Sequence, residues 1–203
     1  MTTLRIGKSI RILQLNVEGL SQDKSEIISR LALVNEADII LLQETHVKSQ
    51  EDMLKRGKNY GFSLADSIDS SVYGIATYVA ENYLDYEVTY KNNCNGVHVI
   101  NLLIGGFNIM NVYKPPIIPW NNPILPAIIH PNFIGGDFNS HNEHWGYPKN
   151  NMNVEVLLEW FSSNNLHILH SAKEKPTFQS ARWMYRYESR SQCCIVYYHQ
   201  CYT

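Results

Sequence analysis

Long apolar runs are missing from this chain of 203 residues. No segment reaches the about 18 apolar residues that a membrane-spanning helix needs, and residues 1–11 lack the apolar core of a signal peptide. Low-complexity tracts and internal repeats are also absent. Because 44% of the residues are hydrophobic, the composition excludes an intrinsically disordered protein. We expect one domain over residues 1–203, intracellular and without membrane association.

Cysteine is scarce, with four residues in the chain. Cys94 stands alone, whereas Cys193, Cys194 and Cys201 lie close to His199 near the end of the sequence. Dense cysteine frameworks are typical of short secreted chains, so this usage favours an intracellular protein. The spacing around His199 matches no established pattern of zinc ligands, and we expect an accidental cluster there.

Positive charge is not in excess. Lys and Arg number 17 against 19 Asp and Glu, which gives a formal net charge of −2. This balance argues against an extended nucleic-acid footprint, which usually requires a basic surface. A local cluster such as Lys55, Arg56 and Lys58, or a bound metal ion, can still supply charge for a phosphate substrate. A solvated helix face is the ordinary interpretation of that cluster.

The chain does contain polar residues at the ends of apolar strands. Gly135 to Asn139 reads Gly-Gly-Asp-Phe-Asn and follows the apolar approach Asn132-Phe133-Ile134. Side chains alternate along a strand, so Asp137 and Asn139 are expected on one face and Phe138 in the core. A carboxylate beside a carboxamide suits a phosphate, a metal-bound water or an attacking nucleophile. A simple turn after the strand is the alternative.

Two earlier segments end in the same way. Residues 12–20 alternate and stop at a glycine, which places Asn16 and Glu18 on a shared face at the strand end. Residues 38–43 contain a short continuous apolar run, Ile39–Leu42, typical of a strand covered on both faces, and Glu44 follows this segment. Mg²⁺ often uses only one or two protein carboxylates besides water and substrate phosphate. We therefore expect these ends to share one cleft, with the Glu44 and Asp137 carboxylates within about 10 Å.

The remaining sequence predicts one α/β unit. Ser21 is expected to cap a helix over residues 22–36 with Ile27, Leu31 and Val34 on its inner face. Further helices are predicted over 50–58 and 154–164, with a proline-rich irregular loop over 115–131. Strands are predicted over 62–65, 73–80, 86–90, 98–104 and 107–113, the last two joined by a two-residue glycine turn.

These motifs occur in an order that resembles a known superfamily. The segments that carry the resemblance are Leu15–Ser21, Leu42–His46, Asn111–Pro116, Gly136–His141, Trp145–Tyr147 and Arg182–Trp183. Together they resemble the endonuclease/exonuclease/phosphatase superfamily, and most closely the apurinic-type endonuclease domain of non-LTR retrotransposons. The resemblance extends from about residue 10 to residue 183.

The resemblance implies a fold and a reaction. The fold is an α/β, four-layered sandwich of two mixed sheets with outer helices. The reaction is hydrolysis of a phosphodiester with Mg²⁺ or Mn²⁺, with DNA as the substrate. A retroelement origin would place the protein in the nucleus, and the oligomeric state stays open.

Candidate metal and phosphate residues follow from the same resemblance. Glu44 resembles the principal metal ligand, and Glu18 stands where a further acidic or amide residue assists the metal. Asn16 matches the active-site asparagine of the superfamily. Tyr113 matches a tyrosine that contacts the scissile phosphate.

The later motifs supply the remaining candidates. Asp137 resembles the residue that orients or deprotonates the attacking water, and Asn139 one that helps to hold the phosphate. Trp145 is a candidate for stacking on a base in a substrate groove, with simple packing as the alternative.

The chain departs from the superfamily beyond Trp183. Its relatives continue with a Pro-Asp-Leu-like strand and a Ser-Asp-His strand, whose Asp-His pair serves acid–base chemistry and phosphate binding. No aspartate follows Asp137 here, and His199, the only histidine after Trp183, follows a tyrosine. We expect residues 184–203 to be an aberrant tail from a truncated or misjoined reading frame, leaving the fold incomplete. The strand-like residues 195–198 are expected to fill one gap.

Two functions of different kinds remain open at this stage. One is a metal-dependent DNA endonuclease whose activity is impaired by the missing Asp-His pair. The other is a catalytically inactive remnant that binds metal or nucleic acid. A phosphatase of the same superfamily is a further alternative.

Overall fold

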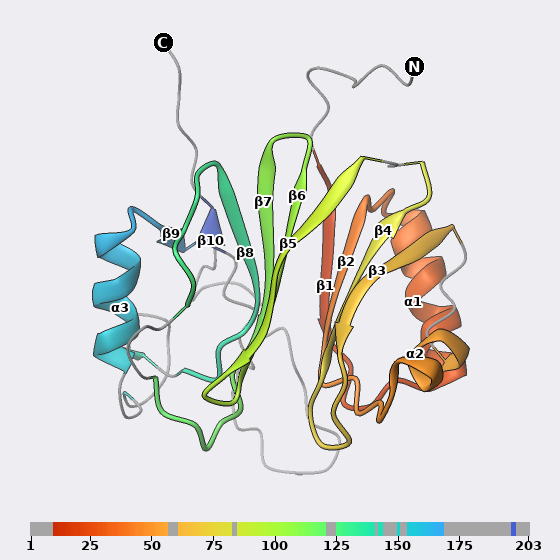
Figure 1. Cartoon of the computed structure of the whole chain (residues 1–203), viewed down its shortest axis with the longest axis horizontal. Helices are drawn as coiled ribbons and strands as arrows, with labels where there is room; N and C mark the ends of the chain where they lie inside the picture. Colours follow the sequence, from red (N-terminus) through yellow and green to blue (C-terminus); the bar gives the residue numbers. More distant parts are fainter. Residues whose placement is uncertain are drawn as a thin grey trace.

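The two sheets of the protein face each other, with helices on both outer sides (Figure 1). The computed structural model describes residues 10–56, 61–82, 85–120, 125–140, 142–143, 150, 154–168 and 196–197. The order of layers is α3, the larger sheet, the smaller sheet, and then α1 with α2. This arrangement confirms the predicted four-layered α/β sandwich. Among the described residues, no helix is long and apolar enough to cross a membrane.

The smaller sheet is mixed and has the strand order β1-β2-β4-β3. β1 and β2 run parallel, and the other pairs are antiparallel. Every residue of β2 is buried, as its apolar run Ile39–Leu42 predicts, and the polar Gln43 at its end is buried too. The strands span β1 Ile12–Asn16, β2 Ile39–Gln43, β3 Phe62–Ile68 and β4 Ile75–Ala80.

The larger sheet has the order β5-β6-β7-β8-β10-β9, and only β7 and β8 are parallel neighbours. The predicted glycine turn joins β6 to β7, and Gly105 and Gly106 both have positive φ, as a tight hairpin requires. The strands span β5 Tyr86–Cys94, β6 Val97–Ile104, β7 Phe107–Tyr113, β8 Asn132–Asp137, β9 His167–Ile168 and β10 Val196–Tyr197.

β10 lies in the segment predicted to be an aberrant tail. Its two residues pair antiparallel with β8 on one side and with β9 on the other. The expectation that the strand-like tail fills a gap in a sheet is therefore confirmed for Val196 and Tyr197. The rest of residues 184–203 lies outside the described residues.

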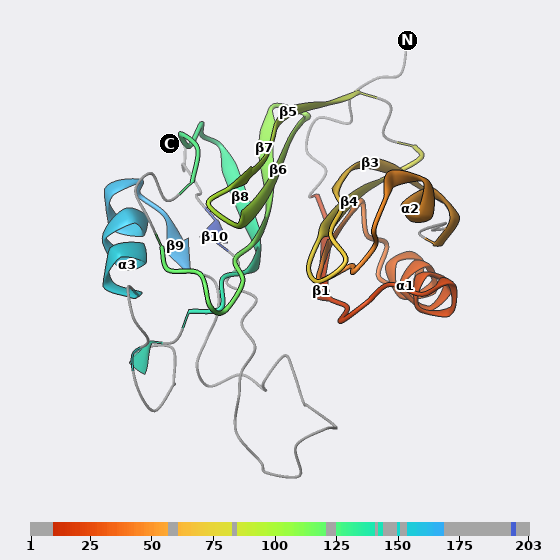
Figure 2. The ribbon, with the colours of Figure 1, turned by 60° about the horizontal axis from the view of Figure 1, so that its bottom comes forward.

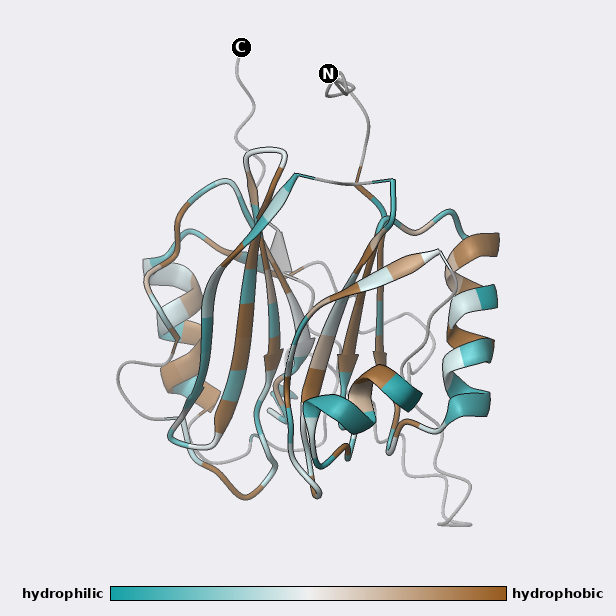
Figure 3. Cartoon of the chain, turned by 45° about the vertical axis from the view of Figure 1, so that its right-hand side comes forward, coloured by the Kyte–Doolittle hydropathy of each residue, from teal (hydrophilic) through white to brown (hydrophobic). Residues whose placement is uncertain are grey.

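The helices begin where the sequence predicts, but α1 buries a different face. α1 spans Gln22–Val34, and the Ser21 hydroxyl accepts a hydrogen bond from the Lys24 N–H at its start. The predicted inner residues are exposed instead: Ile27 at 65%, Leu31 at 40% and Val34 at 82%. α1 lies on the outer side of the smaller sheet (Figures 2 and 3). The buried face carries Ser25, Ile28, Ser29 and Ala32. The prediction of the inner face was wrong because small residues pack this helix closely.

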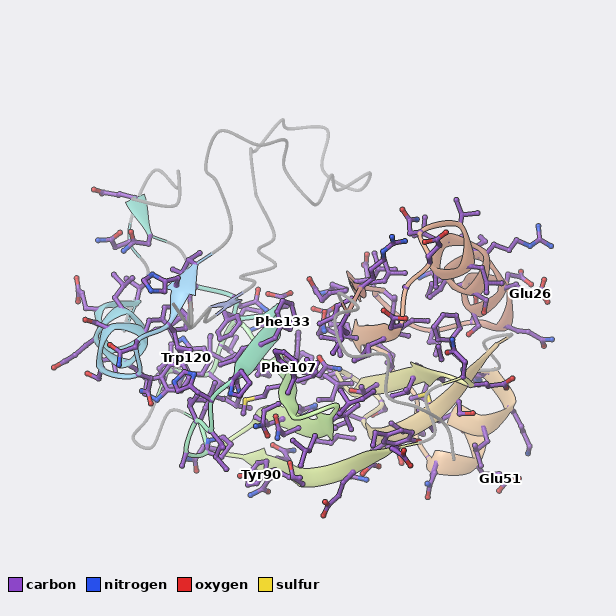
Figure 4. All side chains as sticks on the ribbon, turned by 90° about the horizontal axis from the view of Figure 1, so that it is seen from above. Glu26, Glu51, Tyr90, Phe107, Trp120 and Phe133 are labelled. Carbon is purple, nitrogen blue, oxygen red and sulfur yellow. The ribbon has the colours of Figure 1, made fainter. Side chains whose placement is uncertain are left out.

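α2 spans Gln50–Arg56 and α3 spans Val154–Ser163. α3 packs against the outer face of the larger sheet through Val154, Leu157 and Phe161, which are buried, while Leu158 is partly buried. Trp120 belongs to this outer core, whereas Phe133 packs between the two sheets (Figure 4).

Gly136 permits the close approach of β8 to β7. A Cβ at this position would overlap the backbone carbonyl of Val112, its partner in the parallel pair. Because two bonded strands cannot separate without losing ladder hydrogen bonds, we expect Gly136→Ala to lower the free energy of unfolding by about 3 kcal/mol. Urea unfolding measures this change.

Gly106→Asn is the matched control. A Cβ at this position would meet no atom within 4 Å, and the φ of +83° is one that Asn tolerates better than other non-glycine residues. We expect a loss of about 1 kcal/mol or less. Equal losses in the two variants would contradict the close approach inferred for Gly136.

Candidate functional site

Four polar side chains join the two sheets where β1, β2, β7 and β8 end. Within the sheets, Asn16 is in register with Gln43 beside Glu44, and Tyr113 is in register with Asp137. Between the sheets, the Asn16 amide Nδ2 donates to Asp137 Oδ2 at 2.9 Å. The Tyr113 hydroxyl donates to Glu44 Oε1, also at 2.9 Å. Two hydrogen bonds across the sheets thus bring together residues far apart in sequence.

Glu44 is held at a sharp turn after β2. Its φ is +53°, a left-handed conformation that is uncommon for a residue other than glycine. Its carbonyl accepts from the Gly19 N–H at 2.7 Å, and the His46 N–H donates to the Tyr73 carbonyl at 2.7 Å. The loops after β1 and β3 therefore fix where the Glu44 side chain points.

The Glu44 carboxylate is only partly covered. Its side chain is 21% exposed, and Oε2 lies 3.7 Å from His46 Nε2. Oε1 accepts the hydrogen bond from Tyr113. Among the described residues, the longer contact with His46 is the only one that Oε2 makes. The carboxylate therefore keeps coordination capacity for a cation.

Asp137 is the buried carboxylate of the site, at 3% exposure. Oδ1 accepts from the Asn139 N–H at 3.0 Å, and Oδ2 accepts from Asn16. Burial raises the pKa of Asp137 from 3.8 to about 6. The hydrogen bonds from Asn16 and Asn139 lower this pKa, the charge of Glu44 raises it, and that of Lys114 lowers it. A carboxylate with a pKa near 6 can accept a proton at neutral pH.

Tyr113 is fully buried and remains a hydrogen-bond donor. Burial and then the charge of Glu44 raise the pKa of its phenol far above the ordinary value. Its ring lies 5.5 Å from the Tyr73 ring and 6.1 Å from the His98 ring, measured between centroids. Burial lowers the pKa of His98, so the residue beside Tyr113 is neutral at physiological pH.

The other predicted site residues are Glu18, Asn139 and Trp145. Glu18 is exposed, and no hydrogen bond or ion pair of its carboxylate occurs within the described part of the chain. Its N–H donates to Asn16 Oδ1 at 3.2 Å. Asn139 follows the end of β8 with φ +43°, so strand alternation does not orient it, although Phe138 is buried as predicted. The Asn139 amide donates to the Lys114 carbonyl at 2.9 Å. Trp145 lies outside the described residues.

Sequence reasoning missed two residues that the fold places here. His46 faces Glu44, and its proximity was visible in the motif that both residues share. Lys114 is 3% exposed directly after Tyr113, and its Nζ donates to the Pro115 and Ile118 carbonyls of the loop that follows. A lysine before two prolines gave no signal of burial.

The donor set suits a particular kind of metal site. No group of three His, Cys, Asp or Glu residues able to hold a metal ion occurs among the residues that the structure describes. An all-protein cage does not fit these residues. One accessible carboxylate, Glu44, fits Mg²⁺ or Mn²⁺ that keeps water molecules and takes further oxygen ligands from a substrate phosphate.

Residues 107–184 match the family model described as endonuclease-reverse transcriptase. No curated protein matches the chain. The match spans β7 and β8 and therefore includes Tyr113, Asp137 and Asn139. It supports phosphodiester hydrolysis at the level of the superfamily.

Solved structures share the fold. The endonuclease domain of TRAS1, a telomere-specific non-LTR retrotransposon, is 21% identical with a TM-score of 0.65, covering 92% of this chain and 83% of that one. An AP endonuclease from Archaeoglobus fulgidus is 16% identical with a TM-score of 0.66, covering 93% and 87%. An AP endonuclease from Leishmania major is 13% identical with a TM-score of 0.67, covering 93% and 79%. The family match over residues 107–184 and the shared fold agree with the predicted resemblance to the endonuclease/exonuclease/phosphatase superfamily.

The raised pKa of Asp137 predicts how stability depends on pH. The folded protein binds the proton of the Asp137 carboxyl more tightly than the unfolded chain does. The stabilising contribution of protonated Asp137 is therefore full below about pH 4 and is lost as the pH rises through about 6. Relative to Asp137→Asn, the wild-type protein should lose up to about 3 kcal/mol of unfolding free energy between pH 4 and pH 7.5. Urea unfolding of both proteins in EDTA measures the difference, and a difference that stays constant with pH would contradict this prediction.

Proposed function

We propose that this chain is a Mg²⁺- or Mn²⁺-dependent endonuclease that hydrolyses phosphodiester bonds in DNA, of the non-LTR retroelement type, with impaired activity. The observation that carries the proposal is the pair of hydrogen bonds, Asn16 to Asp137 and Tyr113 to Glu44, that joins two carboxylates of different character at one edge. A nuclear location is part of the proposal if the chain derives from a retroelement.

The two carboxylates suit two different tasks. Glu44 is partly exposed and would hold the metal ion. Glu18 would assist the metal from the neighbouring loop, in which the next residue, Gly19, donates its N–H to the Glu44 carbonyl. The metal ion would supply charge to neutralise the phosphate in the transition state. Asp137 is buried and its pKa of about 6 suits a group that accepts the proton of the attacking water.

The remaining residues would orient these groups and the phosphate. Tyr113 keeps its proton and can donate to an anionic oxygen, as its bond to Glu44 illustrates. Asn16 donates to Asp137 and so favours the ionised form of that carboxylate. Asn139 fixes Asp137 through its N–H, and a direct phosphate contact by its side chain stays a prediction.

DNA is the proposed substrate. The structural neighbours include AP endonucleases and a retrotransposon endonuclease domain, which supports a nucleic acid over a small phosphate ester. The basic cluster near α2 adds little support, because Lys55 pairs with Glu51 at 2.6 Å on an exposed helix face. Lys58 lies outside the described residues.

The proposed impairment rests on the sequence after Asp137, which contains no aspartate and no Ser-Asp-His motif. Removal of one preorganised group that stabilises transition-state charge typically lowers the rate by about 10²–10³. We therefore expect weak nicking of supercoiled plasmid with Mg²⁺ and none with EDTA. Glu44→Ala should abolish whatever nicking the wild-type protein shows, because the metal ion would lose its accessible carboxylate.

Glu51→Ala is the control for Glu44→Ala. Glu51 lies on the outer face of α2 and contacts Lys55, so its loss should leave nicking unchanged (Figure 4). Wild-type nicking that persists in EDTA, or in Glu44→Ala, would overturn the proposed metal-dependent mechanism. Rapid nicking with Mg²⁺ would overturn the proposed impairment alone.

A further inference from the structure

Lys114 carries a charge inside the protein. Its side chain is only 3% exposed, and burying an ammonium group is costly unless the group is well paired. Nζ donates to the Pro115 carbonyl and to the Ile118 carbonyl, both at 2.9 Å. Nζ also lies 5.7 Å from the centroid of the Trp120 ring, a cation–π distance. The ammonium thus binds the loop that follows β7 at three points.

The backbone of Lys114 is tied to the opposite strand end. Its N–H donates to the Asp137 carbonyl at 2.9 Å, and its carbonyl accepts from the Asn139 amide at 2.9 Å. The residue therefore connects β7, which carries Tyr113, to the turn after β8. A shift at Lys114 would move both strand ends of the site.

Trp120 closes the same set of contacts. Its indole N–H donates to Ser140 Oγ at 2.8 Å, and the Ser140 hydroxyl donates to the Phe138 carbonyl at 3.0 Å. Phe138 lies between Asp137 and Asn139 and is fully buried. The loop that Lys114 holds is thus bonded to the turn that contains Asp137 and Asn139.

The ammonium group also acts on Asp137 through its charge. Burial lowers the pKa of Lys114 to about 8, so the group is charged at neutral pH. Its charge lowers the pKa of Asp137, against the effects of burial and of Glu44. A neutral side chain of the same length would fill the space without this effect.

We propose that Lys114 is a positioning residue of the site: its buried ammonium group holds the loop after β7, which Trp120 bonds to the turn after β8, and thereby orients Asp137 and Asn139. Its effect on nicking rests on the proposed function. The effect of the Lys114 charge on the pKa of Asp137 does not rest on the proposed function. The effect on the pKa and the effect on nicking are therefore tested in separate experiments.

The coupling is tested without any activity. Carboxyl carbon NMR in EDTA follows the titration of Asp137 in the wild-type protein, Lys114→Met and Lys114→Arg. We expect the midpoint to rise by about half a unit or more in Lys114→Met and to change less in Lys114→Arg. Lys114→Gln, which is neutral but keeps an N–H donor, replaces Lys114→Met if that variant does not fold. An unchanged midpoint in a folded neutral variant would overturn the proposal.

The effect on nicking is tested with Mg²⁺ and a plasmid substrate. Misplaced reacting groups lower the rate of the chemical step. Lys114→Met should therefore reduce kcat by roughly tenfold to a hundredfold and leave KM within about twofold of the wild-type value. Lys114→Arg should restore part of the loss, and Lys55→Met, with the same change of charge on exposed α2, should change nothing. A rise in KM alone would contradict a positioning role. Absence of nicking in the wild-type protein would count against the proposed function, and the Asp137 titration would still decide the role of Lys114.

Discussion

The side chain of Asn111 connects the two sheets within their largely apolar interface. It is fully buried, its Oδ1 accepts from Gln43 Nε2 at 2.7 Å, and its Nδ2 donates to the Ala76 carbonyl at 3.0 Å. An amide buried there without partners would cost more than an ordinary hydrogen bond contributes, so the sheets can pack in only one register. Tyr113 follows Asn111 by two residues and Glu44 follows Gln43 by one. The same contact that fixes the sheets therefore brings the hydroxyl and the carboxylate into hydrogen-bonding distance.

Backbone strain is concentrated around this edge. Glu18, Glu44, His46 and Asn139 all have positive φ, which costs free energy for residues other than glycine. The strain persists because backbone bonds between three loops over-determine the turn after β2, including Gly19 to Glu44 and His46 to Tyr73. Strained residues held in this way are a common property of binding and catalytic sites. The strained backbone and the polar side chains at the strand ends are separate observations, and both indicate a functional site at this edge of the sheets.

Sequence patterns predicted the parts of the fold that depend on local signals. β7 begins and ends where expected, the glycine turn before it forms, and β2 is covered on both faces. The inner face of α1 was predicted wrongly because Ile27 and its neighbours have the apolar spacing, while close packing selects the serines and Ala32. Asn139 was oriented by strand alternation, but β8 ends at Asp137 and a left-handed turn takes over. The contacts of Lys114 with Asp137 and Asn139 depend on tertiary structure and leave no local trace in the sequence.

The candidate site is assembled almost entirely from residues before position 140. The hydrogen bonds among Asn16, Glu44, Tyr113 and Asp137, and the ties through Lys114 and Asn139, involve no later residue. Changes in the sequence after Ser140 can therefore remove a group that stabilises the phosphate without separating the two carboxylates. In the proposed nuclease, metal binding and activation of water would survive such changes, whereas the charge that develops on the phosphate would lose a partner. Impaired chemistry at preserved strand ends is thus physically consistent, since the hydrogen bonds that join Asn16, Glu44, Tyr113 and Asp137 are separate from the contacts that would stabilise the phosphate.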